Sequence, residues 1–298
     1  MRRSIVSRLL LELRLFFIAL QFFTRVPVPG WVGFKPEWLQ ACARYFPLVG
    51  ACVGVLGALV LAAASLAWPP LVAVLLSMAA TVWMTGGFHE DGWADTCDGL
   101  GGAVSRERAL AIMKDSRLGS YGALGLGLML GLKAAVLTSL LAPVLGELNE
   151  AQSSHVHQVL LGWTLMALVW SHTTSRLAPV LLIRLLPYAG DVEHAKAKPL
   201  ATGVSWGGVL GAVAAWAVVS LALAAWVGHI GWPVPTLWQA MGWATLAVLL
   251  GTWSLLRWLR KRLGGYTGDT LGAAQQVTEV LSLLAWLAVV HPVTWVRW

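Results

Sequence analysis

Hydrophobic positions in this chain gather in long runs instead of alternating with polar ones. Six or seven of the runs hold the roughly 20 mostly apolar residues that an α-helix needs to cross the hydrocarbon core of a bilayer. Trp68-Pro69-Pro70 separates the first two runs, and tandem proline of this kind predicts a tight helical hairpin. The pattern predicts an all-α, polytopic membrane helix bundle of about seven transmembrane helices. The predicted spans are residues 46–68, 69–88, 119–146, 157–186, 204–228, 236–259 and 271–290.

A shorter apolar run over residues 9–25 has a different character. Glu12, Arg14 and Gln21 interrupt it, and no small-residue cleavage site follows, so it is not typical of a secretory signal. If this run crossed the membrane, the basic N-terminus would face outward. We therefore expect an amphipathic helix that lies along the membrane surface, within an N-terminal interfacial region of residues 1–45.

Composition supports one membrane domain over residues 1–298. The chain is 58% hydrophobic and only 12% charged, with a mean hydropathy of +0.71. Its net charge of +7 does not indicate nucleic-acid binding, because the cations lie between the apolar runs. With the N-terminus in the cytoplasm, 18 of the 21 Lys and Arg fall on the cytoplasmic side, as the positive-inside rule requires. The three cysteines form no CxxC pair and predict neither a disulfide framework nor a zinc site.

Acidic residues are rare and unevenly placed. Four of the 14, Glu90, Asp91, Asp95 and Asp98, fall within nine positions. On a helix the three aspartates stand within roughly 60° of one another, so their charges repel unless a cation lies among them. Hard oxygen ligands with little His and no Cys suit Mg²⁺ or Mn²⁺. Residues 89–118 are thus predicted as an acidic, catalytic cytoplasmic loop, and the alternative is a solvated acidic loop.

Glycines and cations follow the acids directly. Three glycines lie in residues 99–102, where a backbone without side chains can approach a phosphate, and Lys114, Asp115 and Arg117 come next. Carboxylates for a metal, then glycines, then cations are the groups needed to hold a diphosphate. His89 could contact the metal or a phosphate, and a hydrogen-bonded helix-end histidine is the alternative.

A second polar segment covers residues 260–280. Asp269 and Gln276 almost superimpose in helical projection, and Glu279 follows on the same predicted span. Polar groups at that depth predict a cavity, or else hydrogen bonds that only join helices. Isolated arginines, by contrast, are typical of surface anchors or topology determinants. These arginines are Arg25, Arg44, Arg106 and Arg108.

The stretch Gly87–Gly102 resembles the signature of the cobalamin synthase family, the adenosylcobinamide-GDP ribazoletransferases, which is close to H-x-D-G-x-A-D-x-x-D-G. The resemblance extends, in order, along most of the chain. Its further motifs are Leu20–Pro27, Arg44–Gly50, Ile112–Gly119, Ser175–Ala178 and Gly265–Ala273.

This resemblance implies a reaction. The hydroxyl of α-ribazole, or of its 5′-phosphate, attacks adenosylcobinamide-GDP at the cobinamide-side phosphorus and releases GMP, with Mg²⁺ as cofactor, at the cytoplasmic face of the bacterial inner membrane. We expect Asp91, Asp95 and Asp98 to bind the metal, with Glu90 as a further ligand, and Asp115 to be the base. The expected phosphate-binding residues are Lys114, Arg117, Arg25 and His89. Asp269, Gln276 and Glu279 form a second polar cluster, which we expect to complete the cavity.

Two other functions stay open from the sequence. Asp95-x-x-Asp98-Gly99 begins like the signature of CDP-alcohol phosphotransferases, but the Ala-Arg that should follow Gly99 is missing. A proton-coupled transporter could use Lys133, Arg176 and Glu279, although no inverted repeat is visible. A homo-oligomer in the lipid bilayer is left open.

Overall fold

The protein is built from helices. The computed structural model describes residues 5–102, 105–142, 150–190 and 203–290, and within these ranges the only β-type pairing is a single bridge between Tyr188 and Tyr266. The expected all-α architecture is thus confirmed. The helices are α1 (Ile5–Phe23), α2 (Pro36–Ala41), α3 (Phe46–Ala64), α4 (Pro70–Thr85), α5 (Phe88–Gly101), α6 (Arg106–Met113), α7 (Ser120–Leu141), α8 (Glu150–Ser175), α9 (Leu177–Leu185), α10 (Trp206–His229), α11 (Val234–Arg262) and α12 (Gly268–Val290), with 3-10 turns η1 (Gly30–Val32) and η2 (Cys42–Tyr45).

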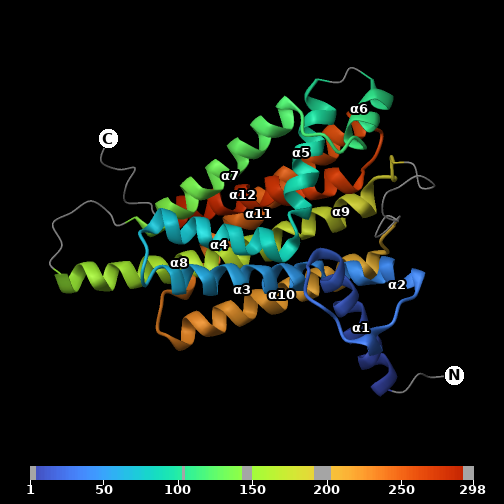
Figure 1. Cartoon of the computed structure of the whole chain (residues 1–298). Helices are drawn as coiled ribbons and strands as arrows, with labels where there is room; N and C mark the ends of the chain where they lie inside the picture. The colour runs from blue at the N-terminus through green and yellow to red at the C-terminus, as the bar shows by residue number, and fades with distance from the viewer. Residues whose placement is uncertain (1–4, 103–104, 143–149, 191–202, 291–298) are drawn as a thin grey trace.

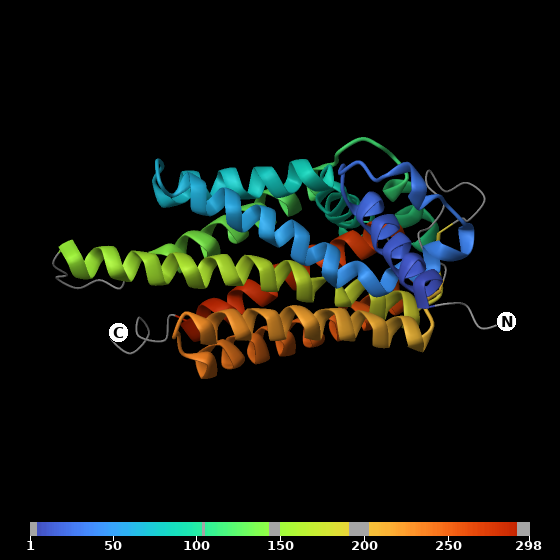
Figure 2. The same ribbon diagram turned by 90° about the horizontal axis from the view of Figure 1, so that it is seen from below.

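The long helices run side by side, and the short ones gather at one end of the bundle. Figure 1 shows α3, α4, α7, α8, α10, α11 and α12 along a common direction, with α1, α2 and α6 at one end. The α3–α4 and α10–α11 turns lie at the opposite end, as the view from below also shows (Figure 2). The basic last turn of α11, Arg260–Arg262, lies at the end that carries α6.

Several helices have the length and composition of membrane spans. Among the described residues, five are long and apolar enough to cross a bilayer, and the bent pair α4–α5 would make a sixth. The protein is therefore a multi-pass membrane protein. α8 runs alongside these spans in Figure 1 but is less apolar, because both of its ends are polar, at Glu150–Gln158 and at Ser171–Ser175. α1 is not among the spans and packs against η2, α2 and α3.

Small residues allow the helices to approach closely. A Cβ on Gly50 of α3 would lie 2.1 Å from the carbonyl oxygen of His172 in α8, and one on Gly54 would lie 2.7 Å from the Cα of Val169. The predicted hairpin is also present, since α3 ends at Ala64 and α4 begins at Pro70. Without water to drive helices together, close backbone packing of this kind stabilises bundles in lipid.

The acidic stretch is a helix and turns sharply away from the span before it. α5 departs from α4 at an angle of 89°. Gly86 and Gly87 form the bend with φ of 71° and 72°, a left-handed conformation that favours glycine. The segment predicted as a loop over residues 89–118 thus contains two helices, α5 and α6. α5 packs on α12, where a Cβ on Gly92 would lie 2.7 Å from the carbonyl oxygen of Asp269.

Candidate active site

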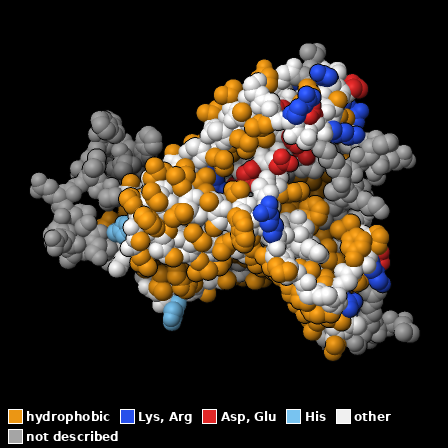
Figure 3. Space-filling view, in the orientation of Figure 1, with side chains coloured by type: hydrophobic (Ala, Val, Ile, Leu, Met, Phe, Trp, Pro, Cys, Tyr) orange, Lys and Arg blue, Asp and Glu red, His pale blue; other side chains and the backbone are white. Residues whose placement is uncertain are grey.

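A cavity of about 740 Å³ opens where α4 ends and α5 begins. Glu90, Asp91 and Asp95 of α5 line it, together with Arg25 from the segment after α1 and Ser116 from the segment after α6. Figure 3 shows acidic side chains in a row along a hollow, with basic side chains nearby, beside the apolar surface of the bundle. The structure therefore brings three of the predicted acids and one predicted phosphate-binding arginine to one cavity.

Arg25 is held at the cavity by the bend between α4 and α5. Its backbone N–H donates to the carbonyl of Met84 at 2.8 Å. Its guanidinium lies so close to Gly86 that a Cβ there would be 2.9 Å from Nε. Gly86 therefore has two roles: it adopts the left-handed conformation of the turn, and its lack of a side chain leaves room for the Arg25 guanidinium. A cation beside three carboxylates is suited to a substrate that carries several negative charges together with a metal.

Asp98 faces a different neighbour. Its carboxylate accepts hydrogen bonds from the backbone N–H groups of Gly119 at 2.7 Å and Gly122 at 2.8 Å, which satisfies donors in the first turn of α7. A Cβ on either glycine would lie within 2.4 Å of an Asp98 oxygen. Asp98 lines a second cavity and not the one that Asp91 and Asp95 share. In the described part of the chain, no three His, Cys, Asp or Glu side chains are arranged to hold a metal by themselves.

The second cavity, of about 750 Å³, adjoins the first. Asp115 and Arg117 line it and form an ion pair in which Nη2 lies 2.5 Å from Oδ2. The hydrogen bond and charge of Asp115 raise the pKa of the Arg117 guanidinium, which keeps it charged. Leu118 lines both cavities, so the two share this residue as part of their walls.

Two predicted phosphate ligands lie elsewhere. His89 is buried, 3% exposed, and stacks on the ring of Phe23 with 5.5 Å between centroids. Lys114 ends α6 and is exposed. Neither residue lines either of the two cavities. Asp269 lies in the first turn of α12, where it accepts a hydrogen bond from the Thr267 hydroxyl at 3.4 Å, and it too lines neither cavity.

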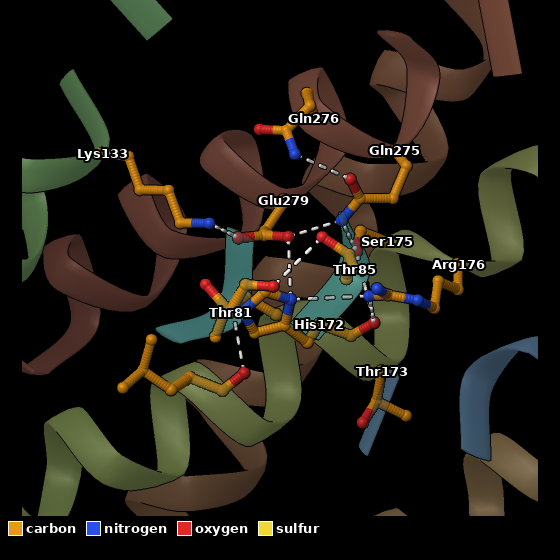
Figure 4. A network of polar contacts seen from close by, with 12 residues as sticks. Thr81, Thr85, Lys133, His172, Thr173, Ser175, Arg176, Gln275, Gln276 and Glu279 are labelled. Carbon is orange, nitrogen blue, oxygen red and sulfur yellow. Dashed lines mark hydrogen bonds and ion pairs between the residues drawn. The ribbon is translucent and has the colours of Figure 1, made fainter. Parts of the chain in front are cut away.

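A buried network of charged and polar side chains lies inside the bundle (Figure 4). At its centre, the fully buried carboxylate of Glu279 in α12 forms an ion pair with Lys133 of α7. The same carboxylate lies 3.0 Å from Nδ1 of His172 in α8 and accepts a hydrogen bond from the amide of Gln275. Arg176, 1% exposed, donates to the carbonyl of His172 at 2.8 Å. Charges buried this deeply are tolerated only when they are paired.

The network reaches the wall of the first cavity through Gln276. Its side-chain amide nitrogen donates to the side-chain Oε1 of Gln275 at 3.1 Å and to Oε1 of Glu90 at 3.0 Å. The other oxygen of Glu90 is buried and has no hydrogen-bond partner among the described residues. The second polar cluster predicted from the sequence therefore lies mostly behind the cavity, and Glu90 joins the two.

Comparison with known proteins identifies the family. The sequence profile described as cobalamin-5-phosphate synthase matches residues 15–287. The chain belongs to the cobalamin-5-phosphate synthase family. Among its relatives, the adenosylcobinamide-GDP ribazoletransferase of Leptothrix cholodnii is 57% identical over 95% of this chain and 98% of its own length. Proteins of that name from Polaromonas naphthalenivorans and Shewanella amazonensis are 43% and 44% identical over 90% and 93% of this chain, and cover 95% of their own lengths. No solved structure matches it.

Membership in the cobalamin-5-phosphate synthase family confirms the resemblance and does not favour the two other functions. Lys133, Arg176 and Glu279, the residues named for a transporter, belong to one buried network, in which Lys133 pairs with Glu279 and Arg176 bonds to His172. The Asp95-x-x-Asp98 pair, which resembled CDP-alcohol phosphotransferases, divides between two cavities.

Sequence reasoning missed or undervalued some residues of this member of the cobalamin-5-phosphate synthase family. His172 was not singled out, although a histidine four positions before Arg176 inside an apolar run was a usable signal. The sequence predicts that Arg108 is a surface anchor or a determinant of membrane topology, yet its side chain lines the second cavity with Tyr121. Ser116 lies within the motif Ile112–Gly119, but only the structure shows that it lines the first cavity.

Proposed function

We propose that this protein transfers the adenosylcobinamide phosphate group of adenosylcobinamide-GDP to α-ribazole or its 5′-phosphate, with release of GMP. The curated relatives named adenosylcobinamide-GDP ribazoletransferase support this reaction, since they match nearly the whole chain. The observation that carries the proposal is the cavity that joins Glu90, Asp91 and Asp95 to Arg25, because a diphosphate needs both metal-binding oxygens and a cation.

The residues in this cavity fit Mg²⁺. Carboxylate oxygens are its preferred protein ligands, and Mg²⁺ is usually held by one or two of them plus water and substrate phosphate. Asp91 and Asp95 would hold it, together with water and substrate phosphate, and Glu90 lines the same cavity. Once bound, the ion would neutralise charge on the diphosphate and on the departing phosphate oxygen. Asp98 is less available, because both its oxygens already accept backbone hydrogen bonds.

The protein's own groups would perform the remaining tasks. Arg25 would bind phosphate oxygens in the first cavity and orient the diphosphate. The acceptor hydroxyl oxygen forms a bond to the cobinamide-side phosphorus while the bond from that phosphorus to the GMP oxygen breaks. Asp115, which lines the adjoining cavity, would take the hydroxyl proton. Arg117 holds the Asp115 carboxylate in position through their ion pair.

We also place this reaction at the cytoplasmic face of the bacterial inner membrane. Both cavities include residues of α5 and of the α6–α7 segment, at the end of the bundle that carries α6 and the basic last turn of α11. Positive charge marks the cytoplasmic ends of membrane helices.

A single assay tests the proposed reaction. Purified protein is incubated with adenosylcobinamide-GDP, either acceptor and Mg²⁺, and GMP is measured. We expect GMP release that requires an acceptor and stops when EDTA removes the metal. A folded preparation that releases no GMP with either acceptor contradicts the proposal. Release that continues undiminished in excess EDTA removes the metal from it.

A further inference from the structure

The names of the family and of its relatives differ in one chemical detail. Cobalamin-5-phosphate synthase names a product that carries a phosphate, whereas ribazoletransferase names an acceptor group without one. An enzyme that favours the phosphorylated acceptor needs a cation for that phosphate, away from the diphosphate of the donor. Among the described residues, Arg25 is the one cation that lines the first cavity, so a separate cation for the acceptor phosphate would come from the second cavity.

The second cavity holds an arginine whose side chain is not otherwise engaged. Arg108 lies in the first turn of α6, and its guanidinium makes no hydrogen bond or ion pair to any described residue, although its backbone N–H donates to Ser105. The other arginine there, Arg117, is paired with Asp115. The N–H groups of Gly119, just before α7, and of Gly122, in its first turn, already donate to Asp98. Arg108 therefore offers a phosphate in this cavity its full set of charge-assisted donors, whereas Arg117 already gives Nε and Nη2 to Asp115.

An aromatic surface lies beside this cation. Tyr121 lines the cavity and is 52% exposed. Its ring packs on Gly101 and Gly102, where an added Cβ would lie 2.8 Å and 3.0 Å from ring atoms, so glycine backbone supports it. A half-exposed ring against which a flat base can stack is a common element of nucleoside sites.

We propose that the second cavity binds the acceptor nucleoside, with Arg108 contacting its 5′-phosphate and Tyr121 its base. This inference rests on the proposed function and assigns the two substrates to separate cavities. Asp115 lines the acceptor cavity, Ser116 lines the donor cavity, and Leu118 lines both. An acceptor held in this way would have its hydroxyl near Asp115, the general base, and near Leu118. The phosphorus of adenosylcobinamide-GDP would lie on the other side of Leu118, in the first cavity. Arg108 then decides how strongly the 5′-phosphate is favoured.

The test compares two acceptors in the full-length protein. For Arg108→Ala, we expect the KM for α-ribazole 5′-phosphate to rise roughly tenfold or more, because a charge-assisted contact is lost. The KM for unphosphorylated α-ribazole should stay within about twofold, and so should the KM for adenosylcobinamide-GDP. Arg108→Lys should recover part of the loss. The matched control is Arg257→Ala, an exposed arginine of α11 that stacks near Trp253 and lines neither cavity.

The outcomes separate this inference from the proposed function. Wild-type protein that releases no GMP with either acceptor overturns both. If Arg108→Ala raises the KM for both acceptors equally, or raises it for adenosylcobinamide-GDP instead, the acceptor-phosphate assignment is wrong while the proposed function stands. Unchanged KM values for every substrate also overturn it. Normal kinetics with unphosphorylated α-ribazole show at the same time that the variant is folded.

Tyr121 has its own matched pair of variants. Tyr121→Ala should raise the KM for both acceptors by a similar factor, roughly tenfold, since loss of a stacking surface affects the base and not the phosphate. Tyr121→Phe keeps the ring and should bind both acceptors normally. A raised KM for adenosylcobinamide-GDP in Tyr121→Ala would assign the ring to guanine and overturn its role in acceptor binding.

Discussion

Asp95 is the residue at which the metal hypothesis can be tested most directly. Its carboxylate lines the first cavity with Asp91 and Glu90. Asp95→Asn keeps the shape of the side chain but removes a charged oxygen ligand, so we expect Mg²⁺-dependent GMP release to fall by roughly 100-fold. The measurement is initial GMP release over a range of Mg²⁺ concentrations, with thermal unfolding as the check on folding.

The control for this variant is Glu37→Gln, which removes an exposed acidic side chain from α2, outside both cavities. It should change neither the rate nor the Mg²⁺ requirement. Near-normal release by Asp95→Asn would exclude this carboxylate from the mechanism.

Asp98 lies on the same helical stripe as Asp95, and we expect its loss to act on stability instead. Asp98→Ala leaves two backbone donors of α7 without their acceptor, at a cost of about 1–2 kcal/mol in the free energy of unfolding. Thermal unfolding in detergent measures the loss. The Mg²⁺ concentration for half-maximal activity of the folded fraction should stay the same, and an increase would return Asp98 to the metal site.

At the scale of helices, the buried ion pair joins α7 to α12. Lys133→Met or Glu279→Gln removes one charge of this pair and leaves the other buried without its partner. Each variant should therefore lower the free energy of unfolding by about 3–5 kcal/mol. The double variant should lose less than the sum of the two single losses, because neither charge is left alone. Denaturation of the four proteins in one detergent gives the cycle.

Lys261→Met is the control for that cycle, since Lys261 is an exposed lysine at the end of α11. Its effect should be close to zero. Additive losses in the Lys133 and Glu279 variants would mean that the two side chains do not depend on each other, contrary to their contact.

The network also explains why α5 can hold acids at the membrane. Gln276 of α12 donates to Glu90, and glycines at positions 92 and 272 let α5 and α12 approach closely. Helix packing and hydrogen bonding thus act on the same pair of helices. Glu90, one of the acids that line the first cavity, is thus joined to the buried Gln276 of α12.

At the scale of the whole molecule, the placement of charge predicts the orientation in the membrane. The α3–α4 turn should face outward, and the basic end of α11 should face the cytoplasm. Single cysteines replacing Ala67 and Lys261, in a chain whose native cysteines are removed, test this with a membrane-impermeant maleimide. In intact spheroplasts we expect Ala67→Cys to react and Lys261→Cys to react only after lysis. The reverse pattern would place both cavities outside.

Sequence alone determined the all-α membrane architecture, the α3–α4 hairpin and the acidic stretch, because these depend on local composition and on the 3.6-residue period. That the first segment lies along the membrane surface stays a prediction. The sequence could place Asp91, Asp95 and Asp98 on one stripe of a helix. Only the tertiary structure decided that Asp98 binds the start of α7 while the other two line a cavity with Arg25, since that depends on which distant segment packs opposite each turn of α5. For the same reason, pairing across α7, α8 and α12 turned Lys133, His172 and Glu279 into one buried network.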